Sequence, residues 1–175
     1  MRTYELKPHQ NQILNEVKNL SKSKLHYLVI QQNRNKPNFT LKELKKHIRL
    51  GIKKYVNQIY PFTNIKDLEK QLVKYYCFFE TSEEFFKSQH KNIIVDENIE
   101  MNLHFHLFIT STDSNIYVPQ LVNNIILEFF GQRNKQSSLL KIDYKKIEKL
   151  EDDFILYHTK QMMYEGNLDF IMKNI

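Results

Sequence analysis

Two histidines, His104 and His106, stand two positions apart in the apolar run 103–109. The flanking residues are aromatic, β-branched or Leu, which is typical of a buried strand. Because side chains alternate along a strand, both imidazoles would share one face while their apolar neighbours pack on the other. Paired imidazoles suit a divalent metal ion, although an isolated His-x-His is often only two half-exposed strand residues.

A carboxylate could complete this pair. Glu80 ends a second predicted strand, 74–80, and antiparallel pairing with the histidine strand would bring it close to both imidazoles. Glu97 and Glu100 lie nearer in sequence and compete for the role, and Glu100 has the same strand parity as His104. Two imidazoles and one carboxylate leave positions open for a phosphate oxygen and water, which favours Mg²⁺ or Mn²⁺ over a closed structural zinc site.

A possible nucleophile lies further on. A helix predicted from about 147 to 164 carries Tyr157 beside Lys160 and Gln161, with Tyr164 two turns along nearly the same face. A phenol has an ordinary pKa near ~10, and a nearby ammonium group or metal ion favours its ionised, nucleophilic form. Each residue alone reads as a packing tyrosine or a solvated lysine. Together with the histidine pair they indicate phosphoryl transfer to tyrosine.

The remaining patterns describe the elements that would position these groups. Apolar periodicity and capping signals predict helices over 9–20, 40–59, 119–130 and 147–164, and short helices at 65–72 and 169–173. Strands are predicted at 25–32, 74–80, 103–109 and 139–144. Gly51 should weaken its helix mildly. This alternation predicts an α+β fold, with an antiparallel sheet of about five strands, flanking helices and a ferredoxin-like split βαβ arrangement.

Length and composition narrow the class of protein. The 175 residues suit one domain, 1–175, and the net charge of +6 suggests a polyanionic partner, although Lys is abundant throughout. One cysteine excludes an internal disulfide framework and a cysteine-based zinc site. We see neither a ~20-residue apolar span nor a signal-peptide pattern. We therefore expect a reducing compartment, the cytoplasm or the interior of an organelle or nucleus, and no secretion.

Three motifs follow one another along the chain in an order that is typical of one protein superfamily. They are the apolar strand Tyr27-Leu28-Val29-Ile30, then His104-Phe105-His106-Leu107-Phe108, then Tyr157-His158-Thr159-Lys160. This combination resembles the HUH endonuclease superfamily, and within it the rolling-circle replication initiators of small plasmids and single-stranded DNA viruses. That family shows a strand with a short apolar motif, a His-hydrophobic-His strand, and Tyr-x-x-Lys on a helix. The resemblance covers roughly residues 24–161.

The resemblance implies specific roles. His104 and His106 would be metal ligands, Glu80 the third ligand, Tyr157 the nucleophile and Lys160 its positioning or charge-stabilising partner. The cofactor would be Mg²⁺ or Mn²⁺. The substrate would be single-stranded DNA at a replication origin, often a hairpin, nicked and rejoined through a 5′-phosphotyrosine. The segment 81–99 is longer than the tight turn common in the family.

Alternatives remain within and outside this family. Single-tyrosine transposases of the superfamily place a glutamine ligand four residues after the tyrosine, where this chain has Gln161, and two-tyrosine initiators make Tyr164 a possible second nucleophile. A non-catalytic nucleic-acid-binding domain is the third possibility. There is no Walker A phosphate loop. Candidate DNA contacts in predicted loops are Arg34, Lys36, Arg133 and Lys135.

Overall fold

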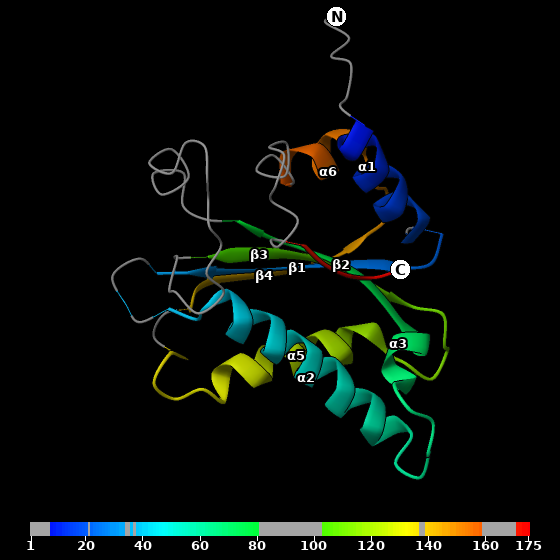
Figure 1. Cartoon of the computed structure of the whole chain (residues 1–175), viewed down its shortest axis with the longest axis vertical. Helices are drawn as coiled ribbons and strands as arrows, with labels where there is room; N and C mark the ends of the chain where they lie inside the picture. Colours follow the sequence, from blue (N-terminus) through cyan, green and yellow to red (C-terminus); the bar gives the residue numbers. More distant parts are fainter. Residues whose placement is uncertain are drawn as a thin grey trace, which may run out of the picture.

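A computed structural model describes residues 8–20, 22–33, 36, 38–80, 103–136, 139–158 and 171–175. Its centre is one five-stranded sheet in the order β4-β1-β3-β2-β5, in which every neighbouring pair is antiparallel (Figure 1). The strands are β1 (Leu25–Gln32), β2 (Val73–Glu80), β3 (His104–Ser111), β4 (Leu139–Ile147) and β5 (Ile171–Asn174). β3 lies between β1 and β2, so the predicted α+β fold with a split βαβ unit is confirmed.

Helices lie on both faces of the sheet. α2 and α5 cover one face, whereas α1 and α6 lie on the other (Figure 1). The helices are α1 (Pro8–Leu20), α2 (Leu41–Ile59), α3 (Leu68–Leu72), α5 (Val118–Phe130) and α6 (Asp152–His158). Among the described residues, no helix is long and apolar enough to cross a bilayer.

The α2–α5 layer is tightly packed. α2 begins at a complete capping box, in which Thr40 and Glu43 each accept the other's backbone N–H. A Cβ added at Gly51 would lie 2.6 Å from the Cα of Ile125 on α5. Gly51 therefore lets the two helices touch, and this close approach explains a glycine whose sequence context suggested only mild helix weakening. Beneath the helices, Phe105 packs on Phe129 at a ring separation of 5.7 Å.

Two segments differ from the sequence-based prediction. β4 continues to Ile147, which pairs with Leu25, so α6 begins at Asp152 and not at residue 147. Residues 171–174 form β5 along β2, where a short helix over 169–173 was expected. The expected continuation of the nucleophile helix to residue 164 lies outside the described residues.

Candidate metal centre

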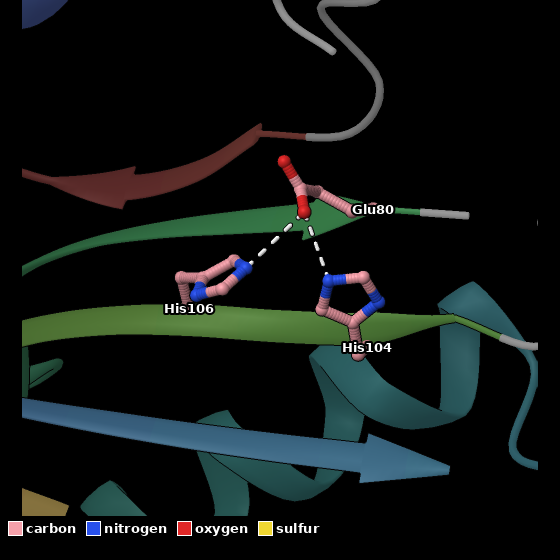
Figure 2. A group of neighbouring side chains, drawn as sticks. All are labelled: Glu80, His104 and His106. Atoms are coloured by element: carbon pink, nitrogen blue, oxygen red, sulfur yellow. Dashed lines mark hydrogen bonds and ion pairs between the residues drawn. The ribbon is translucent and has the colours of Figure 1, made fainter. Parts of the chain in front are cut away.

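Glu80, His104 and His106 meet at one end of the β2–β3 pair. Glu80 lies opposite His104 in the register, and Phe78 lies opposite His106. Because positions two apart point to the same face, this register gathers all three polar side chains on one side of the sheet. Glu80 Oε2 lies 2.8 Å from His104 Nε2 and 3.3 Å from His106 Nε2 (Figure 2). The expected proximity of Glu80 to both histidines is confirmed.

The three side chains could hold a metal ion. One ligand atom from each lies within 4.8 Å of the others. The side chains of Glu80 and His106 are 4% and 7% exposed, whereas that of His104 is 24% exposed, so the cluster is buried on one side and reaches solvent on the other. An imidazole–imidazole–carboxylate set with an accessible side suits a divalent cation that keeps further positions for other ligands.

The carboxylate itself suits a cation. Glu80 Oε1 is buried and has no hydrogen-bond partner among the described residues, and it points away from both imidazoles (Figure 2). A buried carboxylate oxygen without a partner is unfavourable, because it has lost water and gained nothing in exchange. A divalent cation beside the imidazoles would compensate the charge of this poorly solvated carboxylate, so the residues present fit a metal ion.

Electrostatics keep Glu80 ionised. Burial alone would raise the pKa of its carboxyl group, but hydrogen bonds from His104 and His106, together with their charge, outweigh burial and lower this pKa to about 2. The carboxylate is therefore anionic throughout the neutral range, as a metal ligand must be.

Tyr27 on β1 reaches the cluster from the neighbouring strand. Its hydroxyl lies 2.6 Å from His106 Nδ1, the ring nitrogen that does not face Glu80. Tyr27 is 3% exposed, and burial, followed by the charges of Glu80 and Asp143, raises the pKa of its phenol well above the ordinary value. Tyr27 is therefore a neutral hydroxyl that can either donate to or accept from His106. Sequence reasoning placed Tyr27 in an apolar motif but did not connect it with the histidines.

A buried glutamine fixes the start of the histidine strand. Gln32 at the end of β1 donates from Nε2 to the carbonyl of Leu103, at 2.6 Å, directly before His104. Its Oε1 accepts the backbone N–H of Phe39 at 2.5 Å. Gln32 is 3% exposed, so these bonds are shielded from water. They hold the start of β3, the strand that carries both histidines, in place.

α6 is seated on the same face through aromatic contacts. The ring of Phe154 meets Tyr27 edge-on at 5.1 Å and Phe108 at 6.0 Å. Lys145 of β4 lies over the Phe154 ring at 4.3 Å, and over the Tyr27 ring at 5.6 Å. At the other side of α6, Asp152 forms a 2.6 Å ion pair with Lys18 of α1.

Tyr157, the candidate nucleophile, lies on α6 three residues after Phe154, so both belong to one side of the helix. It is 65% exposed. Phe154, on that side of α6, contacts Tyr27 and Phe108, which both lie on the face of the cluster. The structure therefore brings Tyr157 to the face that carries the cluster.

Several predicted residues lie outside the described part of the chain. They are Lys160, Gln161 and Tyr164, the competing carboxylates Glu97 and Glu100, and Arg34. Their roles stay predictions.

The candidate DNA contacts that are described differ from one another. Lys36 and Arg133 are exposed. Lys135 is partly buried and lies 2.9 Å from Glu43 and 2.8 Å from the carbonyl of Asn38. Lys135 is therefore tied to the start of α2, and a contact with a nucleic acid would have to compete with this structural ion pair.

Two lysines that the sequence analysis did not single out lie on the site face. The register pairs Lys141 with Gln31 and Lys145 with Tyr27, so both share the face of Tyr27 on the exposed edge strand β4. Sequence spacing could not reveal this, because the face of β4 depends on its register with β1.

No protein-family model matches this chain, and no curated protein or solved structure is detectably similar to it.

Proposed function

We propose that this protein is a metal-dependent endonuclease of the HUH type, which nicks and rejoins single-stranded DNA through a covalent 5′-phosphotyrosine and so initiates rolling-circle replication of a plasmid or small virus. The observation that carries the proposal is the Glu80–His104–His106 cluster, on the same face of the sheet as α6, the helix that carries Tyr157. The order of motifs along the chain supports the same assignment.

Glu80, His104 and His106 would hold the cation. A bound Mg²⁺ or Mn²⁺ supplies Lewis-acid polarisation of a phosphate oxygen and orients the scissile phosphodiester. The Tyr157 oxygen forms a bond to phosphorus as the bond to the 3′ oxygen breaks. The phenolic proton passes to solvent, the departing 3′ oxygen takes up a proton from solvent and leaves as a hydroxyl, and the 5′ phosphate stays on Tyr157. Lys160 is proposed to stabilise the phenolate and the phosphate charge.

A basic protein surface supports a DNA substrate. The chain carries a net charge of +6, and Lys141 and Lys145 lie exposed on the face of the cluster. Such lysines would contact phosphates, so binding should weaken as salt rises. Exposed Tyr and Phe side chains could stack on unpaired bases.

The decisive experiment detects the covalent product. The protein is incubated with a pool of single-stranded oligonucleotides labelled at the 3′ end, including hairpins, and Mn²⁺, and is then run on a denaturing protein gel. We expect a label-bearing band that needs the metal, is lost in Tyr157→Phe and persists in the matched variant Tyr144→Phe. Tyr144 is a second exposed tyrosine, and its pairing with Leu28 places it on the face of the sheet opposite the cluster.

The other outcomes separate the alternatives. A band that survives Tyr157→Phe but is lost in Tyr164→Phe keeps the enzyme class and moves the nucleophile. A band that also requires Gln161, tested as Gln161→Ala, in a dimeric protein favours the transposase branch. DNA binding without any covalent band, with or without metal, contradicts the proposal and favours a binding domain.

A further inference from the structure

We infer that Tyr27 is a positioning residue with two separable roles: its hydroxyl orients the metal ligand His106, and its ring seats the helix that carries Tyr157. The inference rests on the metal centre of the proposed function. It assigns to β1 a task in that centre although β1 supplies none of the three ligands.

The first role follows from the hydrogen bonds of His106. Nε2 faces Glu80 and Nδ1 faces the Tyr27 hydroxyl, at 3.3 and 2.6 Å. A neutral imidazole carries one proton, so a metal ion at Nε2 requires that Nδ1 holds the proton and donates to an acceptor. The Tyr27 oxygen is at the right distance to accept it. Such outer partners fix the ring orientation and the tautomer of ligating histidines.

A hydroxyl suits this position better than a carbonyl or a carboxylate. Without a metal ion, Nε2–H can donate to Glu80 while Tyr27 donates its own proton to Nδ1. With a metal ion, the direction reverses and Nδ1–H donates to Tyr27. Because a hydroxyl both donates and accepts, Tyr27 can hold the ring in the same plane in both states.

The second role follows from the ring contacts. Tyr27 meets Phe154 edge-on at 5.1 Å, and Lys145 lies over both rings. Phe154 is three residues before Tyr157 on α6. α6 has only seven residues, which is too short for stable helix formation alone, so its position depends on such tertiary contacts. The Tyr27 ring thereby connects α6, the helix that carries Tyr157, with the metal ligand His106.

The two roles can be separated by two substitutions. Tyr27→Phe keeps the ring and removes the hydroxyl. Phe154→Leu keeps the hydroxyl of Tyr27 and removes the aromatic contact. Tyr144→Phe is a matched control, because Tyr144 makes the same kind of bond to a histidine, His26 Nδ1, at 2.7 Å, outside the cluster.

Metal affinity tests the first role. Isothermal titration with Mn²⁺ should show a dissociation constant about 10–100-fold higher for Tyr27→Phe than for the wild type, the usual cost of losing an outer partner. Tyr144→Phe should bind as the wild type does. In ¹⁵N spectra of the histidines with diamagnetic Zn²⁺, His106 should carry its proton on Nδ1. Wild-type affinity in Tyr27→Phe, or a bound His106 protonated at Nε2, overturns this role.

Hydrogen exchange tests the second role without relying on activity. Phe154→Leu should speed amide exchange in α6 and leave the Mn²⁺ dissociation constant unchanged. Tyr27→Phe should leave amide exchange in α6 unchanged and raise the Mn²⁺ dissociation constant. Slow α6 exchange in Phe154→Leu overturns the seating role, and a change of both readouts in both variants overturns their separation. Circular dichroism confirms that each variant is folded.

These measurements distinguish failure of the inference from failure of the proposed function. If the wild type forms the covalent DNA product but Tyr27→Phe binds Mn²⁺ normally, the function holds and the inference fails. If Tyr27→Phe weakens Mn²⁺ binding as expected but the wild type never forms the covalent product, the positioning role holds and the proposed function fails.

Discussion

Two tyrosine–histidine pairs on opposite faces of the same sheet show what makes a metal site. Tyr27 and His106 join β1 to β3 at 2.6 Å, and Tyr144 and His26 join β4 to β1 at 2.7 Å. Counted as whole residues, both histidines are 5% exposed. By residue type, distance and burial of the histidine the two pairs are almost the same, although Tyr144 is 37% exposed and Tyr27 only 3%.

They differ in the charges that act on them. His106 lies beside the ionised carboxylate of Glu80. The pKa of His26, by contrast, is lowered by burial and then by the positive charges of Lys146 and Lys24. A cation would be attracted to the first pair and repelled from the second. A histidine pattern alone therefore indicates little, and the nearby carboxylate distinguishes the two sites.

The strongest test of this comparison removes the carboxylate. Glu80→Gln keeps the shape of the side chain but loses its charge, so Mn²⁺ affinity should fall by more than the ~100-fold that outer-shell substitutions cost. His26→Gln removes the histidine of the other pair and should leave the affinity unchanged. Titration calorimetry with each purified variant measures both constants. Equal losses in the two variants would mean that Mn²⁺ binding depends on overall integrity and not on the cluster.

The next test acts on the helix layer alone. Gly51→Ala places a methyl group against the backbone of Ile125, and overpacking of this kind should lower the free energy of unfolding by about 1–3 kcal/mol. Gly131 is the matched control, because its φ of −64° suits any residue and an added Cβ would lie 3.4 Å from its nearest neighbour. Gly131→Ala should change stability by less than about 1 kcal/mol.

Chemical denaturation measures both glycine variants. Well below the melting temperature, Gly51→Ala should still bind Mn²⁺ with wild-type affinity, since the cluster lies on the other face of the sheet. Weaker binding by the folded variant would show that the helix layer and the cluster are coupled.

The smallest expected effect is a difference in pH dependence. The pKa of Glu80 is lowered from 4.5 to about 2, so its contribution to stability is complete above pH 4.5 and is lost as the pH falls towards 2. The pKa of His47, on α2, is lowered from 6.5 chiefly by burial. The unfolded chain then takes up a proton first, so stability declines as the pH falls below 6.5.

Substitutions test which residue causes the loss of stability in each pH range. His47→Phe should reduce the decline that begins near pH 6.5, to which His26 also contributes because its pKa is lowered as well, and metal-free Glu80→Gln should reduce the one between pH 4.5 and 2. Melting temperatures measured across the pH range test both. If the two variants flatten the same window, the assignment of the groups is wrong.

Much of the site could be predicted because it depends on local alternation. His104 and His106 share a face in any strand, and Glu80 ends a strand whose antiparallel pairing is the simplest arrangement. Both predictions are confirmed. The positions of Lys160 and Gln161 relative to the cluster stay predictions.

The secondary-structure predictions were wrong where pairing between strands distant in sequence determines the local conformation. Ile147, Leu150 and Phe154 have helical spacing, which favoured an early helix start, but pairing with β1 keeps the chain extended to Ile147. Residues 171–174 are extended because they pair with β2. The role of Tyr27 was equally hidden, because its partner lies on another strand and no spacing in the sequence joins them.

All three ligands of the candidate centre lie on β2 and β3, the two sheet neighbours that follow one another directly in chain order. The other pairings in the sheet join strands that are not consecutive, so they close longer loops and carry a larger entropic cost. β2 and β3, which carry the three ligands, can therefore pair early in folding, before β4 and β5 complete the sheet. A metal ion present during synthesis would then bind a partly folded chain and guide its assembly, so the cation would act on the folding pathway as well as on the finished protein.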